Sequence, residues 1–112
     1  MTEPLLLLAF LAAAAPRYEP PPEVFYPQAV ACAVSARIAA GKKMDGDKFG
    51  ELMTWGLILA DVGRKAGRTK EQVDSGDLVA AEPFYKRLKE KKPKAFAAHR
   101  AYCRALLDAD RP

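Results

Sequence analysis

The stretch QAVACAVSARIAA, residues 28–40, has the spacing of a helix that packs on two sides. Its larger apolar residues recur every four positions, at Val30, Val34 and Ile38. A neighbouring stripe of the same helix carries only small residues: Ala29, Cys32, Ala36 and Ala39. Small side chains allow a second helix to approach closely, so we expect Cys32 to face a packed partner rather than water.

Residues 47–66 form the most apolar stretch after the first 27 residues, centred on LMTWGLILA at 52–60. One helical face carries Phe49, Leu52, Met53, Gly56, Leu59, Ala60 and Gly63, and a second carries Trp55, Ile58, Leu59 and Val62. Because apolar surface surrounds most of this helix, we expect it to be the central one, with Asp47 as its N-cap. A glycine inside a helix costs roughly 0.5–1 kcal/mol relative to alanine, so Gly56 and Gly63 indicate close approach of another backbone.

The C-terminal half predicts further helices separated by turn signals. Thr69 and Gln72 have the spacing of a capping box, and DSGD at 74–77 is expected to form a turn. A helix from Leu78 or Pro83 to Lys91 follows, with Pro83 in its first turn, and the last helix runs from Pro93 to about Asp108. The sequence shows neither strand-like alternation nor an internal repeat. It therefore predicts an all-α fold, a small bundle of about four helices.

The two cysteines of the chain, Cys32 and Cys103, lie on inward faces of the first and last predicted helices. We expect a disulfide between them, and two buried but unlinked thiols are the alternative. On the chain-entropy account, closing a loop of this length stabilises the fold by roughly 4 kcal/mol. That is a large contribution for a chain of 112 residues, which can hold one domain with one modest core.

The N-terminal run LLLLAFLAAAAP, residues 5–16, is typical of a secretory signal. Its eleven apolar residues fall short of the ~20 that cross a bilayer as a helix, so no transmembrane span is expected. We predict a signal peptide at 1–15, cleaved near Ala14, although MTEP at its start has no Lys or Arg. A retained first helix or a membrane anchor is the alternative. Residues 16–27 are a proline-rich leader, 28–112 the helical domain, and the location is periplasmic or secreted.

Motifs for catalysis or metal binding are weak. His99 and Cys103 are one helical turn apart and Cys32 is a conceivable third ligand, but zinc needs a fourth ligand and His99 is the only histidine. The sequence lacks a Ser/His/Asp set, a pair of carboxylates in an apolar setting and a glycine-rich phosphate loop. We therefore predict a protein that is not an enzyme and has neither a metal nor another cofactor.

Positive charge is concentrated near the C-terminus. Residues 86–104 hold eight Lys or Arg against the single Glu90, a local balance of +7, whereas the whole chain has a net charge of +4. Such a surface can bind an acidic protein or an anionic polymer, with Phe84 and Tyr85 beside it for stacking, whereas a solvated helix face is the simpler interpretation. The candidate binding residues are Lys86, Arg87, Lys89, Lys91, Lys92, Lys94 and Arg100.

These observations favour a small exported helical protein that binds another macromolecule through its basic C-terminal third, without catalysis. Nucleic acid is not expected as the partner of an exported protein. The alternative is a cytosolic or membrane-surface protein that keeps its N-terminal segment and binds nucleic acid or anionic lipid through the basic helix. The oligomeric state is open at this point.

Overall fold

The computed structural model describes residues 24–42 and 45–109. These residues form α2 (Tyr26–Ala40), α3 (Gly46–Lys65), the π-helical segment η1 (Gln72–Asp77), α4 (Leu78–Lys91) and α5 (Pro93–Asp108). They include no strand, so the predicted all-α bundle of about four helices is confirmed. The predicted signal peptide and most of the predicted leader lie outside the described residues. Within residues 24–42 and 45–109, no helix has the length and apolarity that a bilayer span requires.

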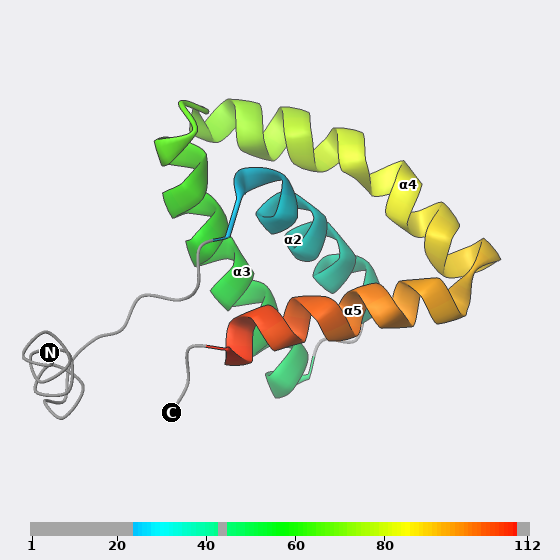
Figure 1. Ribbon diagram of the computed structural model, residues 1–112. Coiled ribbons are helices and arrows are strands. Elements are labelled where there is room, and N and C mark those ends of the chain that lie inside the picture. Colours follow the sequence, from blue (N-terminus) through cyan, green and yellow to red (C-terminus); the bar gives the residue numbers. More distant parts are fainter. Residues whose placement is uncertain (1–23, 43–44, 110–112) are drawn as a thin grey trace, which may run out of the picture.

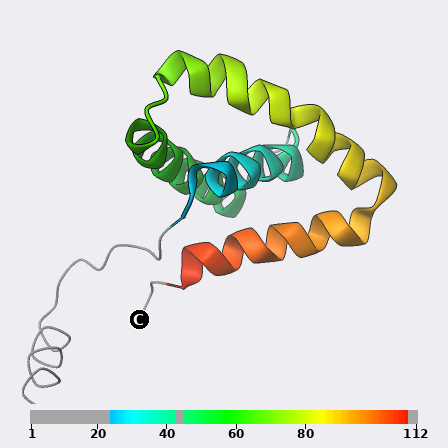
Figure 2. The same cartoon turned by 45° about the horizontal axis from the view of Figure 1, so that its top comes forward.

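Helix α2 is the centre of the fold (Figure 1). It contacts α3, α4 and α5, and the view in Figure 2 shows it enclosed between α4 and α5. Its buried residues lie on every side: Ala29, Val30, Cys32, Ala33, Val34, Ser35, Ala36 and Ala40. The prediction that residues 47–66 form the central helix is wrong. The alanine-rich surface of α2 lets three helices approach at once, which the bulky side chains of α3 do not allow.

Helix α3 buries only one of its two apolar faces. Trp55 is fully buried and Leu59 is 5% exposed, and both belong to the core around α2. On the opposite side, Phe49, Met53 and Leu57 remain 53%, 51% and 71% exposed. The apolar pattern that surrounds this helix therefore marks a core face and, separately, an open face.

Each of the first two helices begins a few residues before the start that the sequence predicts. α2 starts at Tyr26, with Pro27 in its first turn, and the side chain of Gln28 accepts a hydrogen bond from the Phe25 N–H at 2.8 Å. α3 is capped by Asp45, whose carboxylate accepts from the Lys48 N–H at 2.9 Å. The N-cap is thus Asp45 and not Asp47, because Asp45 has the extended backbone that an N-cap needs.

The two glycines singled out in α3 differ in their surroundings. A Cβ atom on Gly63 would lie 3.3 Å from the Val73 side chain and 3.4 Å from the Tyr26 ring, so this position is closely packed, although against side chains rather than a backbone. A Cβ atom on Gly56 would have no neighbour within 4 Å. Within residues 24–42 and 45–109, the expected close approach of another backbone is therefore absent at Gly56.

Residues 74–77, predicted as a turn, instead belong to η1, which continues directly into α4. The predicted capping box is present: the Gln72 N–H donates to the Thr69 hydroxyl at 3.1 Å, and the Thr69 N–H donates to the Gln72 side chain at 2.9 Å. Val73 is buried, and contacts of this kind outweigh the local preference of Asp, Ser and Gly for turns.

η1 and α4 together form one long helical arm, which we call the η1–α4 arm. Pro83 lies inside α4 rather than in its first turn. The arm therefore contains both a π-helical turn and a proline, two features that bend helices.

The carboxylate of Asp77 joins the start of α2 to η1, the first part of the η1–α4 arm. Asp77 accepts a hydrogen bond from the Tyr26 hydroxyl at 2.6 Å and a bidentate pair from Arg68 at 2.9 and 3.0 Å. The hydrogen bond from Tyr26, followed by that from Arg68, lowers the pKa of Asp77. Burial, with the same hydrogen bond, raises the pKa of Tyr26. This cluster holds η1 against the N-terminal end of α2.

The other end of the fold is joined by a disulfide and a buried ion pair. The predicted bond between Cys32 of α2 and Cys103 of α5 is present, with the Cα atoms 5.6 Å apart and the two cysteines separated by 71 positions in sequence. Close to it in sequence, Arg100 pairs with Glu51 of α3 and donates to the Ser35 hydroxyl at 3.0 Å. These interactions connect α2, α3 and α5.

Candidate functional site

Basic residues from the end of α4 and the beginning of α5 meet at the corner between these two helices. Pro93 creates this corner because proline has no N–H to continue a helix and restricts the residue before it to extended backbone. Lys92 accordingly has φ −137° and ψ 69°, and α5 begins at Pro93 as predicted. The two helices therefore meet at an angle, and their charged ends come together (Figure 1).

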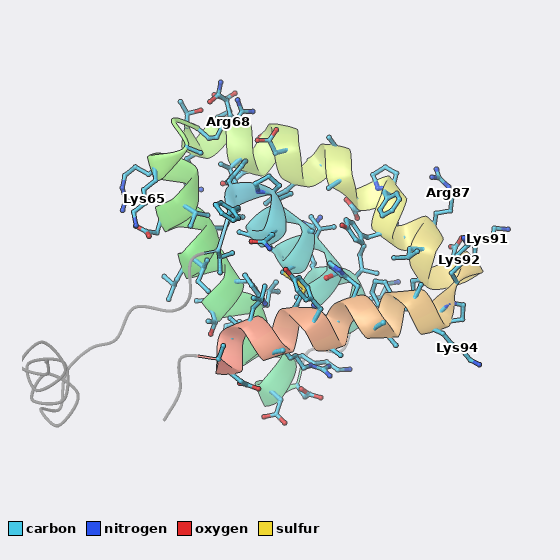
Figure 3. All side chains as sticks on the ribbon, viewed as in Figure 1. Lys65, Arg68, Arg87, Lys91, Lys92 and Lys94 are labelled. Carbon is cyan, nitrogen blue, oxygen red and sulfur yellow. A yellow bond between two sulfur atoms is a disulfide. The ribbon has the colours of Figure 1, made fainter. Side chains whose placement is uncertain are left out.

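Four of the predicted binding residues gather at this corner: Arg87, Lys91, Lys92 and Lys94. Figure 3 shows their side chains extending outward from the end of α4 and the beginning of α5. Lys91 lies in the last turn of α4, where a cation interacts favourably with the helix dipole. We call these four residues the basic corner.

The basic corner is not neutralised by the rest of the described chain. Within residues 24–42 and 45–109, no ion pair joins any of its four cations to a carboxylate. Glu90 is the nearest acidic residue in sequence, and it is exposed on the same helix. Four like charges held together without counter-charges attract anions from solution.

An apolar surface adjoins these charges. A cavity of about 260 Å³ is lined by Phe84 and Leu88 together with Arg87, Lys91 and Lys92. Phe84 is 55% exposed, and the aliphatic stems of the three cations extend the apolar lining. Phe84 was expected beside the basic residues, whereas Leu88 was not. Its position four residues after Phe84, on the same helical face, is the signal that identifies it.

The N-terminal end of α5 adds unpaired backbone donors to the same corner. No side chain caps this end, and its first turn contains no acidic residue. Helix N-termini carry partial positive charge on their free N–H groups, so the end of α5 and the cations of the basic corner favour the same kind of ligand.

The other three predicted binding residues lie elsewhere. Lys86 is exposed and pairs with Glu82 at 3.2 Å, and Lys89 points towards the Ile38 carbonyl oxygen at 3.5 Å. Arg100 is only 5% exposed, because it enters the core to pair with Glu51. The expectation that Arg100 lies on the basic surface is therefore wrong: its positive charge serves the interior of the fold.

Tyr85, the other aromatic residue expected beside the patch, also faces inward. Its ring stacks on His99 with the ring centroids 5.0 Å apart, and burial raises the pKa of Tyr85. Phe84 contacts the Tyr85 ring edge-on at 4.8 Å. Of the two aromatic residues expected beside the patch, Phe84 is therefore the one placed to contact a ligand at the corner.

His99 lies against the disulfide. Its Nε2 atom is 3.5 Å from Cys103 Sγ and 3.5 Å from the Ala31 carbonyl oxygen. Burial lowers the pKa of His99, so the imidazole is neutral at pH 7. Cys32, His99 and Cys103 thus lie close together, as a metal site formed by these three residues would require. The disulfide uses both sulfur atoms, however, so the imidazole is the one conventional metal ligand left in this group.

A larger cavity, of about 620 Å³, lies between α2, α3 and the η1–α4 arm. Its apolar lining includes Val34, Leu59, Val73 and Leu78. Each of the four cations at its rim already has a carboxylate partner: Arg37 with Glu82, Arg64 with Asp61, Arg68 with Asp77 and Lys70 with Asp74. This rim is electrically balanced, in contrast to the basic corner. No local sequence pattern indicates this cavity, because its walls come from four separate segments.

Fold and site together define a small all-α domain with one disulfide between helices and a cationic, partly apolar corner. Comparison with profiles of known protein families, with curated proteins and with solved structures finds no match.

Proposed function

We propose that this chain is an exported, non-enzymatic binding protein that holds an acidic protein or another anionic polymer at the basic corner. The observation that carries the proposal is the absence, among the described residues, of any ion pair at Arg87, Lys91, Lys92 and Lys94. The cations elsewhere that line the larger cavity are paired, so the corner is where added negative charge gains most.

The neighbouring apolar cavity favours a partner that offers more than charge. Phe84 and Leu88 can receive an apolar side chain from an acidic segment, while the surrounding cations bind its carboxylates. Phosphate-rich polymers offer charge without such an apolar group. An acidic polypeptide therefore uses both properties of the corner.

Export is supported by the disulfide and by the N-terminal run of eleven apolar residues. Disulfides persist in oxidising compartments such as the bacterial periplasm and are rare in reducing cytosol. The bond between Cys32 and Cys103 joins α2 to α5 through residues that are 71 positions apart in sequence. Intact-mass measurement of the product from a Gram-negative host tests this point directly: we expect a chain that begins near Ala15 and has no free thiol.

Binding is tested with fluorescein-labelled polyglutamate, by anisotropy. One variant carries Arg87→Gln, Lys91→Gln, Lys92→Gln and Lys94→Gln. A control variant with the same net charge carries Lys42→Gln, Lys48→Gln, Lys65→Gln and Lys70→Gln. We expect the corner variant to lose at least roughly tenfold in affinity, about 1.4 kcal/mol, and the control to lose much less.

The salt dependence and the competing probes decide between partners. Binding should weaken from roughly 0.01 to 0.2 M salt, as the Debye length falls from ~30 Å to under 10 Å. Equal losses in the two variants would show that only net charge matters and would contradict a site at the corner. Tighter binding to a single-stranded oligonucleotide, or to phosphatidylglycerol vesicles, would favour the alternative function in nucleic-acid or lipid binding.

A further inference from the structure

Helix α3 has an open apolar face that neither the core nor the basic corner uses, and one edge of it, at Gly56 and Ala60, also lines the larger cavity. At 100° per residue, it covers an arc of roughly 120° along the helix. Every position in that arc between residues 46 and 60 is apolar or glycine, and all are exposed: Gly46, Phe49, Gly50, Met53, Gly56, Leu57 and Ala60. We call this set the α3 stripe.

Among the described residues, none approaches the glycines of the α3 stripe closely enough to require glycine there. A Cβ atom on Gly46, Gly50 or Gly56 would have no neighbour within 4 Å. Gly50 and Gly56 each weaken the helix by roughly 0.5–1 kcal/mol relative to alanine, and no contact within the described residues requires them. Glycine on a helix surface allows a second helix to come close, and here that helix must come from outside the described chain.

The order of residues in the α3 stripe is a palindrome about Met53. Reading outward in both directions, glycine stands at 50 and 56, a large apolar residue at 49 and 57, and a small residue at 46 and 60. In a twofold contact each residue i meets residue j of the partner, and j meets i. An antiparallel pair of α3 helices centred on Met53 therefore places Gly50 against Gly56, and Phe49 against Leu57.

The charges at the two ends of α3 also favour an antiparallel arrangement of the two copies. The helix begins with Asp45 and Asp47 and ends with Arg64 and Lys65. Arg64 and Lys65 bind Asp61 of their own helix at 2.7 and 3.1 Å, but both side chains remain more than 70% exposed. Antiparallel pairing opposes the two helix dipoles. In the register centred on Met53, Asp45 of one copy stands level with Asp61 of the other, where Arg64 and Lys65 bind that carboxylate and leave a net positive charge.

We infer that α3 pairs with α3 of a second copy of this chain, antiparallel and with Met53 on the twofold axis. A contact between two helices is smaller than the roughly 800 Å² per partner that a stable pair of proteins buries, so the dimer is weak and depends on concentration. The inference does not depend on the proposed function, because the basic corner lies on α4 and α5.

Sedimentation equilibrium of the purified, oxidised protein tests the pairing, at roughly 10 µM to 1 mM, where weak pairs associate. We expect a reversible monomer–dimer equilibrium. Met53→Glu and Met53→Lys should each be monomeric, because the substituted residue faces its own copy across the axis. An equimolar mixture of these two variants should dimerise again, since Glu then faces Lys. Val79→Glu, at another exposed apolar position, is the control and should dimerise like the unchanged protein.

A protein that stays monomeric throughout this range would overturn the inference, and the α3 stripe would then be covered by another partner, by the N-terminal segment or by a membrane surface. Dimers that persist in Met53→Glu would place the contact on a different face. Failure of the mixture to dimerise, with both variants folded by circular dichroism, would rule out a twofold axis at Met53. Polyglutamate binding by Met53→Glu should equal that of the unchanged protein. Loss of dimerisation can therefore be distinguished from failure of the proposed binding at the basic corner.

Discussion

Arg100 of α5 and Glu51 of α3 form an ion pair inside the fold, with their side chains only 6% and 14% exposed. Arg100 also donates to the Ser35 hydroxyl of α2, and Arg104 approaches the other carboxylate oxygen of Glu51 at 3.6 Å. Three helices therefore depend on one carboxylate, because without it the Arg100 guanidinium would be buried without a counter-charge.

Replacing this carboxylate should strongly destabilise the protein. We expect Glu51→Gln to lower the free energy of unfolding by about 3–5 kcal/mol, the cost of leaving a buried charge without its partner. Urea denaturation at pH 7 measures it, with the exposed Glu90→Gln as control. The double variant Glu51→Met with Arg100→Leu should recover much of the loss. A Glu51→Gln variant as stable as the Glu90→Gln control would contradict the role of the pair.

Arg100 also shows why the sequence could not predict the whole site. Its neighbours in the basic segment extend into solvent, and nothing in the local pattern separates it from them. It is buried because α5 turns that side towards α2, as Cys103 one turn later indicates, and because Glu51 lies opposite on a distant helix. Charge runs predict where cations are dense, whereas only the packing shows which of them remain free.

The fold itself was more predictable, for reasons that are also visible in particular residues. Prolines and capping residues act locally, so the start of α5 at Pro93 and the capping box of Thr69 and Gln72 followed from the sequence. The central position of α2 did not, because it depends on how many neighbours a helix accepts. Residues 74–77 likewise became helical through tertiary contacts of Val73 and Asp77, which local turn propensity cannot register.

Asp77 should make stability depend on pH in the acid range. Hydrogen bonds from Tyr26 and Arg68 lower its pKa below the ordinary 3.8, so the unfolded chain takes up a proton first as the pH falls. The stabilisation is therefore complete above pH 3.8 and is lost as the pH falls through the lowered pKa. We expect Asp77→Asn to be less stable than the unchanged protein at pH 7, and the difference to shrink towards pH 2. Urea midpoints across this range test it, and a constant difference would refute it.

His99 should act in a different pH window. Burial, and to a lesser degree the charge of Arg100, lowers its pKa below the ordinary 6.5. The unfolded chain therefore binds the proton more readily, and stability falls as the pH drops from about 6.5 towards the lowered pKa. In His99→Gln this part of the pH dependence should vanish, even if lost stacking on Tyr85 lowers the stability at every pH. Identical slopes between pH 7.5 and 5 in both proteins would argue against a neutral, buried imidazole.

The two glycines of α3 should respond oppositely to alanine. Gly56→Ala enters open space, so the better helix former should raise the free energy of unfolding by about 0.5–1 kcal/mol. Gly63→Ala places a methyl group 3.3 Å from Val73 and 3.4 Å from Tyr26, and this crowding should cancel or reverse the gain. Thermal unfolding in dilute protein, where α3 does not pair, compares them. Equal stabilisation of both variants would mean that Tyr26 does not pack against Gly63.

The disulfide should account for a large part of the stability of so small a core. Cys32 and Cys103 are both fully buried, and their bond links positions 71 apart in sequence, so its removal restores freedom to more than half of the unfolded chain. We expect Cys32→Ala with Cys103→Ala to lower the free energy of unfolding by about 4 kcal/mol, with an unchanged helical spectrum if the protein still folds. Reduction of the unchanged protein by dithiothreitol should produce the same loss, whereas reduction should not affect the double variant. A thermal midpoint that is the same with and without reductant would show that the helices hold together without the bond.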